Sequence, residues 1–288
     1  MKGSRRFGRV GLVAKVSPKA LRLTSLLARA LSRRGLEVVY DNVTALAMRK
    51  VDGVRRERIA RVADLVIVLG GDGTLLSVAR EAPRSTPVLG INVGALGYLT
   101  GLKQAETVSR LDEVLNGGFR EDRRRRLEVS ITEGVNRGTY RALNDAVLNR
   151  ETIGRISRFS LSIERRQIAR FRGDGVIVAT PTGSTAYSLS AGGPILDPAL
   201  AAVVVTPISP HSLTQRPLVV PSSATIGLMV IGGKRDEGVH LTLDGQASFV
   251  IPPGCMVEVR ESRSLVTLLR PPESDNFHNL SEKLNWGV

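Results

Sequence analysis

At 288 residues the chain is long enough for two domains, and its hydrophobic fraction of 42% and charged fraction of 24% are ordinary for a globular protein. The single cysteine, Cys255, excludes an intramolecular disulfide, and no apolar run is long enough to cross a bilayer as a helix, so we expect a cytoplasmic protein without a secretory signal. The formal net charge of +14 favours an anionic partner, either nucleic acid or a small polyanionic substrate.

The first 122 residues alternate short apolar runs with helical patterns. Ser17 and Pro18 are typical of a helix N-cap and of the first helical position, and Gly35 marks the end of that helix. Strands are expected at 7–14, 36–40, 65–69 and 87–91, and helices at 18–34, up to 61, at 74–80 and at 108–115. This alternation predicts an α/β domain with an open, mostly parallel, Rossmann-like sheet, whose ligands bind at the carboxyl ends of the strands.

After Arg126 the pattern changes to short alternating runs, which predict an all-β sandwich. Its strands are expected at 127–132, 140–148, 159–163, 176–179, 202–206, 226–231, 240–243, 257–259 and 265–269. The run Arg123–Arg126 is interpreted as a solvated surface between domains. We therefore expect an α/β nucleotide-binding domain at 1–122, an all-β domain at 123–271, and a helical tail at 272–288 that docks back on the first domain.

The apolar run at 65–69 ends in Gly70-Gly71-Asp72-Gly73-Thr74, ahead of a helical pattern. Glycines let a ligand approach the backbone, and a helix start offers N–H groups to a phosphate. The turn lacks the Gly-Lys-Ser/Thr of a Walker A loop, and Leu76 occupies the place of the last glycine of a dinucleotide fingerprint. A hairpin is less favoured because the residues after Thr74 do not alternate. The sequence predicts a phosphate-facing loop that carries one carboxylate, Asp72.

Three further stretches combine turn residues with polar side chains. The segment from Gly173-Asp174-Gly175 to Pro194 is dense in Gly, Ser and Thr, which suits a ligand loop, although Asp174 could also form a hairpin. Asn144-Asp145 interrupts an apolar run and would suit ribose hydroxyls or a tight turn, and Asp244-Gly245-Gln246 has the same two interpretations. The three histidines are isolated, so we expect no protein metal site, and magnesium would arrive with a nucleotide.

These motifs occur in one order, followed by Pro210-His211-Ser212-Leu213 and by the tail 277–286, and together they closely resemble the bacterial NAD kinases over nearly the whole chain. The Gly-Gly-Asp-Gly-Thr turn alone is weak, because lipid kinases and phosphofructokinases use similar turns, whereas the block 180–194 is specific. The resemblance implies a homo-oligomeric, magnesium-dependent enzyme that transfers the γ-phosphoryl group of ATP to the 2′-hydroxyl of the adenosine ribose of NAD, giving NADP. In that light Asp72 is expected to be the general base.

The resemblance also implies the other site residues. Asn144 and Asp145 match the ribose-binding pair, although many relatives have Glu in place of Asp145, which leaves this side chain one methylene shorter. Tyr98, in place of the more usual Phe, is expected near the adenine. The remaining substrate or nucleotide contacts are expected at Gly71, Gly73, Thr74, Arg155, Arg172, Asp174, Thr185, Ala186, Tyr187, Ser188, Leu189, Ser190 and Gln246.

Three other functions are weighed against this one. A lipid kinase would share the loop at 70–74 but not the block 180–194. A basic nucleic-acid-binding module would account for the charge and would bind with a steep salt dependence. A non-catalytic NAD sensor is disfavoured by the intact Asp72. The sequence leaves open whether polyphosphate replaces ATP, whether NADH is accepted, and whether the assembly is a dimer or a tetramer.

Overall fold

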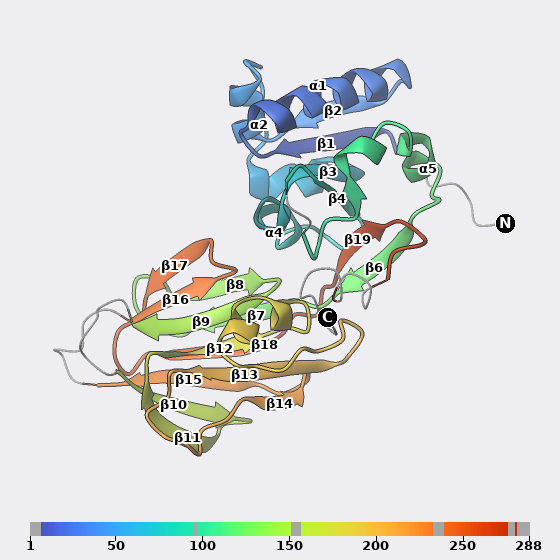
Figure 1. Cartoon of the computed structure of the whole chain (residues 1–288). Coiled ribbons are helices and arrows are strands. Elements are labelled where there is room, and N and C mark those ends of the chain that lie inside the picture. Colours follow the sequence, from blue (N-terminus) through green and yellow to red (C-terminus); the bar gives the residue numbers. More distant parts are fainter. Residues whose placement is uncertain (1–6, 95–96, 151–156, 233–238, 276–279, 281–288) are drawn as a thin grey trace. The chain divides into compact units, whose positions relative to one another are not determined.

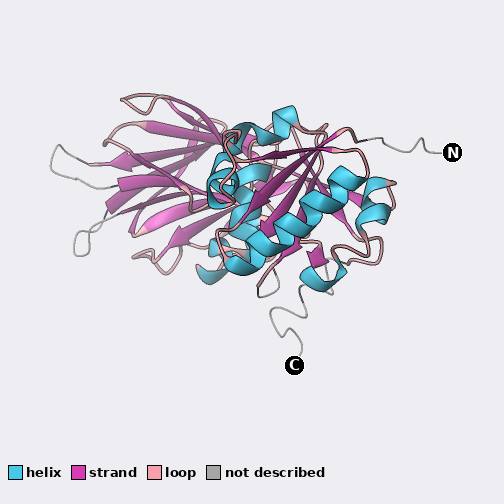
Figure 2. Ribbon diagram, turned by 90° about the horizontal axis from the view of Figure 1, so that it is seen from above, coloured by secondary structure: helices cyan, strands magenta, loops and turns pink. Residues whose placement is uncertain are grey.

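The structure, a computed structural model, describes residues 7–94, 97–150, 157–232, 239–275 and 280. The chain divides into two compact units: unit 1 comprises Met1–Arg123 and Leu265–Val288, and unit 2 comprises Arg124–Ser264. The long helices lie in unit 1, whereas strands dominate unit 2 (Figures 1 and 2). No helix in the described ranges is long and apolar enough to span a membrane.

Unit 1 is built on a seven-stranded sheet. Its strands are β1 (Arg9–Ala14), β2 (Glu37–Tyr40), β3 (Leu65–Gly70), β4 (Val88–Asn92), β5 (Leu102–Lys103), β6 (Arg120–Arg124) and β19 (Val266–Arg270). Its helices are α1 (Pro18–Arg33), α2 (Asn42–Ala47), α3 (Ile59–Val62), α4 (Asp72–Ala79) and α5 (Leu111–Leu115), with 3-10 turns at η1 (Arg56–Arg58) and η2 (Gln104–Glu106). The expected alternation of strands and helices is confirmed.

The sheet order is β2-β1-β3-β4-β19-β6, with β5 paired to β4. Strands β1, β2, β3, β4, β5 and β19 pair in parallel, as predicted for an open Rossmann-like sheet. The run at 265–269 was expected in the second domain, and that prediction is wrong: β19 pairs with β4, with Leu268 opposite Val88. The chain thus returns to unit 1 at Leu265 rather than at residue 272. An apolar run of five residues fits either sheet, so only the pairing decides its place.

Helix α1 illustrates how local signals set the fold of unit 1. The Ser17 side chain accepts a hydrogen bond from the Ala20 N–H, Pro18 occupies the first turn, and Gly35 adopts a φ of +74° just after the helix. The helix lies beside β1 and β2 (Figure 1). Its apolar stripe packs on the sheet through Leu23, Leu27 and Leu31. Each such leucine contributes about 1.5–3 kcal/mol by leaving water.

Unit 2 contains two six-stranded sheets in which every pair of neighbouring strands is antiparallel. The first, in the order β11-β10-β15-β18-β7-β8, consists of β7 (Leu127–Ile131), β8 (Gly138–Ala142), β10 (Ser157–Ile163), β11 (Arg166–Gly173), β15 (Ile226–Ile231) and β18 (Met256–Glu261). The second, in the order β14-β13-β12-β9-β16-β17, consists of β9 (Asp145–Arg150), β12 (Gly175–Ala179), β13 (Ala202–Ile208), β14 (Leu218–Pro221), β16 (Val239–Leu243) and β17 (Ala247–Val250). Short helical segments η3 (Gly183–Thr185) and α6 (Tyr187–Ser190) follow β12.

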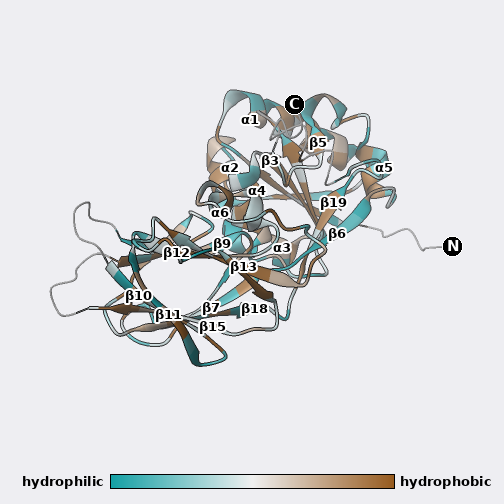
Figure 3. Ribbon diagram, turned by 60° about the horizontal axis from the view of Figure 1, so that its bottom comes forward, coloured by the Kyte–Doolittle hydropathy of each residue, from teal (hydrophilic) through white to brown (hydrophobic). Residues whose placement is uncertain are grey.

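One core cluster of unit 2 draws on both sheets, which form two layers in Figure 3. Phe159 and Phe171 from one sheet and Leu148 and Val178 from the other belong to it. The all-β sandwich is therefore confirmed. The expected single strand at 140–148 is wrong, because the chain changes sheets there: β8 ends at Ala142 and β9 begins at Asp145 in the other sheet.

The arginine run Arg123–Arg126 is only in part the solvated surface that the sequence predicts, because Arg123 alone is exposed. Arg124 and Arg126 are buried, and the Arg126 guanidinium donates to the carbonyl and hydroxyl oxygens of Ser264 at 3.0 and 2.7 Å. Arg125 forms an ion pair with Glu261. Buried charges need such partners. The tail expected to dock on unit 1 lies outside the described residues at 276–279 and 281–288.

Candidate active site

The turn between β3 and α4 places Asp72 at the carboxyl end of a buried parallel strand. Gly71 is the N-cap of α4, and its carbonyl accepts from the Thr74 and Leu75 N–H groups at 3.1 and 3.2 Å. The helix begins at Asp72, two residues earlier than predicted. Gly70 allows the tight turn, since a Cβ there would lie 2.6 Å from Oγ1 of Thr74. The hairpin alternative is thereby excluded, and Gly71, Gly73 and Thr74 are at or within the first helical turn.

The loop after β4 wraps around the Asp72 carboxylate. The Tyr98 N–H donates to Oδ2 at 2.7 Å, and the Leu99 N–H donates to Oδ1 at 3.0 Å. Gly97 permits this approach, because a Cβ there would lie 2.1 Å from Asp72 Oδ1. Desolvation, followed by the nearby Asp72 charge, raises the pKa of the Tyr98 hydroxyl. Two predicted site residues, Asp72 and Tyr98, therefore meet in unit 1, and the fit depends on a glycine that sequence reasoning did not single out.

In unit 2 the Asp244 carboxylate holds the turn at Asn144 and Asp145. Asp244 Oδ1 accepts from the Leu143, Asn144 and Asp145 N–H groups at 3.0, 2.7 and 3.2 Å. Asp244 and Gly245 both have positive φ, 52° and 64°, in the hairpin between β16 and β17. The turn interpretation of Asp244-Gly245-Gln246 is correct, but the Asp244 side chain also organises a second turn. The Asp-Gly pair predicts the hairpin, but it does not predict the contact between the Asp244 side chain and the turn at 143–145.

Asp145 is buried with 4% exposure at the start of β9. Desolvation, and after it the negative charge of Asp244, raises the pKa of the Asp145 carboxyl to about 7. The neighbouring Asn144 Oδ1 is buried and has no hydrogen-bond partner among the described residues. A buried amide oxygen of this kind is usually satisfied by a donor. The interruption of the apolar run thus corresponds to an unusual polar pair as well as to a turn.

The block 180–194 packs directly on that turn. Thr180 donates its N–H to the Asn144 carbonyl at 2.9 Å and its hydroxyl to the Leu143 carbonyl at 2.7 Å. Gly183 makes the contact possible, because a Cβ there would lie 2.1 Å from the Asn144 carbonyl oxygen. The structure therefore brings the predicted ribose pair and the predicted dinucleotide segment together within unit 2.

Within Thr185–Ser190 the side chains differ in accessibility. Tyr187 and Ser190 are exposed, and Thr185, Ala186 and Leu189 are half-buried. Ser188 is fully buried, and its hydroxyl lies 2.9 Å from that of Thr206, so this side chain supports the segment from behind.

Of the remaining predicted contacts, Gln246 follows by two residues the Asp244 that binds the turn at Asn144 and Asp145, whereas Asp174 and Arg172 belong to the chain around the end of β11. Asp174 forms an ion pair with Arg150 at 2.7 Å where the chain passes from β11 to β12. These strands belong to different sheets, so the hairpin alternative for Asp174 is excluded. Arg172 is exposed on β11, opposite Arg158 of β10, and Gln246 is exposed at its hairpin. Arg155 lies outside the described residues.

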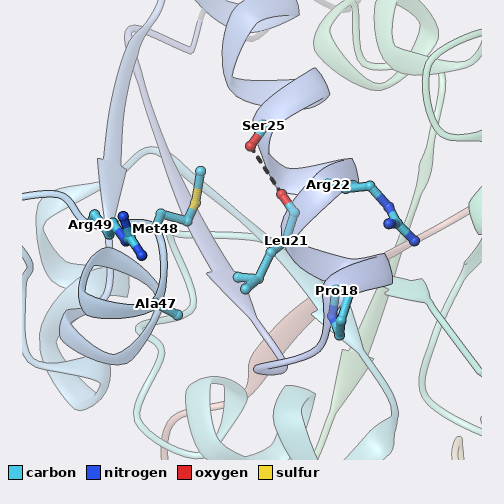
Figure 4. A pocket seen from close by; sticks show the side chains of 7 residues that line it. All are labelled: Pro18, Leu21, Arg22, Ser25, Ala47, Met48 and Arg49. Atoms are coloured by element: carbon cyan, nitrogen blue, oxygen red, sulfur yellow. Dashed lines mark hydrogen bonds between the residues drawn. The ribbon is translucent and has the colours of Figure 1, made fainter.

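Neither a metal cluster nor the cavity in Figure 4 locates the substrate. Among the described residues, no group of three or more His, Cys, Asp or Glu side chains could hold a metal ion. A cavity of about 350 Å³ lies between α1 and the end of α2, where Leu21 and Met48 face each other (Figure 4). None of the predicted site residues lines this cavity.

Both halves of the chain match family models. The model described as ATP-NAD kinase N-terminal domain matches residues 10–119, and the ATP-NAD kinase C-terminal domain matches residues 143–270. The chain is 41% identical over 283 residues to an NAD kinase of Syntrophotalea carbinolica, covering 97% of this chain and 99% of that protein. An NAD kinase of Koribacter versatilis is 42% identical over 282 residues, covering 96% and 98%.

Solved structures agree with these relatives. A yeast NADH kinase complexed with NADH is similar with a TM-score of 0.89 and 26% identity, covering 100% of this chain and 89% of that one. An NAD kinase from Archaeoglobus fulgidus in complex with ATP gives a TM-score of 0.77 and 25% identity, covering 96% and 98%. The chain belongs to the NAD kinase family, whose members are phosphotransferases.

Proposed function

We propose that this chain transfers the γ-phosphoryl group of ATP to the 2′-hydroxyl of the adenosine ribose of NAD, giving NADP and ADP. The observation that carries the proposal is the Asp72 carboxylate, held by two backbone N–H groups at the carboxyl end of β3 in a chain of this family. The related structures contain NADH and ATP, respectively, which supports both substrate classes. Neither a lipid kinase nor a nucleic-acid-binding module receives support from the family matches.

Asp72 would act as the general base. Each of its carboxylate oxygens accepts one N–H group, and each retains a further lone pair that can take a proton. The 2′-hydroxyl proton passes to Asp72 as the ribose oxygen bonds to the γ-phosphorus, and the bond from that phosphorus to the bridging oxygen breaks to release ADP. Such transfers depend on positioning and charge stabilisation more than on covalent chemistry. The helix start at Gly71, Gly73 and Thr74 suits the donor phosphates.

The polar residues of unit 2 would hold the dinucleotide. The orphaned Oδ1 of Asn144 can accept a hydrogen bond from a ribose hydroxyl, and the Asp145 carboxylate can accept another when it is ionised. Thr185–Ser190 would contact the dinucleotide beside this pair, with Asp174, Arg172, Arg155 and Gln246 as further contacts. Tyr98 is proposed for the adenine.

Magnesium would enter as part of the nucleotide substrate, because this ion needs few protein ligands when phosphates hold it. The proposal also includes polyphosphate as an alternative donor and homo-oligomeric assembly. A cytoplasmic location is proposed from the composition, in which the single cysteine forms no intramolecular disulfide.

The test is formation of NADP by the purified chain with NAD, ATP and magnesium, and its loss in Asp72→Asn. Removing a general base should lower kcat by roughly 100-fold or more, while NAD binding measured by calorimetry persists. Asp64 offers a matched control, since its carboxylate accepts the Gly8 and Arg9 N–H groups, both at 2.8 Å, at the opposite end of β3. Asp64→Asn should keep its activity. Near-normal turnover by Asp72→Asn would refute the assigned role, and absence of NADP with the intact chain would refute the function.

A further inference from the structure

The segment Tyr98–Gly101 of unit 1 is held from two sides by charged side chains. Asp72 accepts the N–H groups of Tyr98 and Leu99 at 2.7 and 3.0 Å. Arg270 donates to the carbonyl oxygens of Tyr98 and Thr100 at 2.8 and 3.2 Å. Two N–H groups of the segment thus bind a carboxylate, and two of its carbonyls bind a guanidinium.

Two of these four hydrogen bonds share a single peptide group. The Tyr98 carbonyl, which accepts from Arg270, and the Leu99 N–H, which donates to Asp72, belong to the same planar unit. Because that unit is rigid, the guanidinium sets the direction in which the N–H points. Hydrogen bonds in series also polarise one another, so the Arg270 contact strengthens the Leu99 contact to Asp72.

The Arg270 side chain is buried and held in place by its surroundings. It is the last residue of β19, is only 2% exposed, and has Asp122 of β6 within 3.3 Å of its Nε. The planar guanidinium presents its donors in a fixed fork, so three of them can be aimed at three acceptors at once. A lysine carries the same charge but cannot reproduce that fork.

We infer that Arg270 is a positioning residue for Asp72, acting through the peptide group between Tyr98 and Leu99. The inference rests on the proposed function only in that Asp72 is the base. Arg270 binds no substrate in this scheme. It orients the two N–H donors that fix the position of the Asp72 carboxylate.

The kinetic test compares Arg270→Lys with Arg126→Lys. Arg126 is an equally buried arginine of unit 2 that holds the carbonyl and hydroxyl oxygens of Ser264. Arg270→Lys should lower kcat about ten-fold or more, with KM for NAD and ATP within about two-fold, because misplacing a reacting group acts on turnover. Arg126→Lys should lower the melting temperature about as much as Arg270→Lys does, but it should leave kcat within about two-fold of the wild type. Equal effects of the two variants on kcat would overturn the inference.

A second readout is independent of activity. Amide hydrogen exchange of the ligand-free protein should become about ten-fold faster at Tyr98 and Leu99 in Arg270→Lys and stay unchanged there in Arg126→Lys. Unchanged exchange at both amides in Arg270→Lys would overturn the inference even if kcat fell. If the intact chain makes no NADP, the proposed function fails, while the exchange result still decides whether Arg270 orders this loop.

Should Arg270→Lys fail to fold, Asp122→Asn removes only the carboxylate beside the guanidinium. It should speed exchange at Tyr98 and Leu99 and lower kcat more than Arg126→Lys does. Exchange and kcat equal to those of Arg126→Lys would contradict the positioning role.

Discussion

Replacing Asp145 by asparagine should change how the free energy of unfolding depends on pH. Burial and the Asp244 charge raise the pKa of the Asp145 carboxyl from 3.8 to about 7 in the folded protein. The folded state therefore holds this proton more tightly than the unfolded state does. Stability from this group is fully present below pH 3.8 and is lost as pH rises through about 7.

The size of the effect follows from the same two pKa values. Each pKa unit corresponds to about 1.4 kcal/mol, so the interval from 3.8 to about 7 is worth at most about 4 kcal/mol. Asparagine has the same shape but does not titrate. As pH rises through about 7, the free energy of unfolding of Asp145→Asn should therefore gain on that of the wild type by up to that amount. Any constant cost of the buried amide cancels, because only the pH dependence is compared.

The assay is calorimetric unfolding of both proteins without ligands between pH 4.5 and 8.5. Asp112→Asn provides a matched control, since the Arg34 guanidinium lowers the pKa of the Asp112 carboxyl from its ordinary value of 3.8. That variant should differ from the wild type by a constant amount across this range, because the Asp112 carboxyl stays ionised at every pH of the assay. A difference between Asp145→Asn and the wild type that stays constant across the range would refute the reasoning.

Three further predictions concern the contacts around the two carboxylates. Gly97→Ala places a Cβ 2.1 Å from Asp72 Oδ1 and should lower kcat on the order of 100-fold. Gly94→Ala, in open space in the same loop, should retain wild-type kcat in the NADP assay, and equal kcat values for the two variants would contradict the prediction. Gly183→Ala places a Cβ 2.1 Å from the Asn144 carbonyl oxygen, so thermal denaturation should show a loss of about 1–3 kcal/mol and kinetics a higher KM for NAD; an unchanged melting temperature would disprove the clash. Asp244→Asn removes a charge that raises the pKa of Asp145, so the pH at which stability falls should move lower in the calorimetric series, and an unmoved midpoint would show that desolvation alone sets it.

Features that depend on neighbouring residues could be predicted from the sequence. Ser17 and Pro18 begin α1 as expected, and the glycine-rich turn after β3 carries Asp72 at the end of a buried strand. Capping, turn geometry and the period of apolar residues are encoded within a few positions. The family resemblance added the ribose pair, which composition alone could not distinguish from a tight turn.

Features that depend on distant residues could not be predicted. Asp244 lies 100 residues from Asn144, and Arg270 lies 172 residues from Tyr98, so no local pattern announces either contact. Strand β6 has the sequence Arg-Glu-Asp-Arg-Arg, which shows no apolar alternation. Only its pairing with β19 identifies it as a strand, and that pairing cannot be read from the sequence. The place of β19 beside β4 is a property of the whole fold.

The return of the chain to unit 1 has a consequence for synthesis. Strand β6 reaches the sheet only through β19, so until the ribosome has made residue 270 the growing sheet ends at β4 and β5. All of Arg124–Ser264 is translated in that interval, which lasts on the order of ten seconds. During this time the edge of β4 lacks its partner, and open edges invite pairing with other chains. The unit that begins first is completed last.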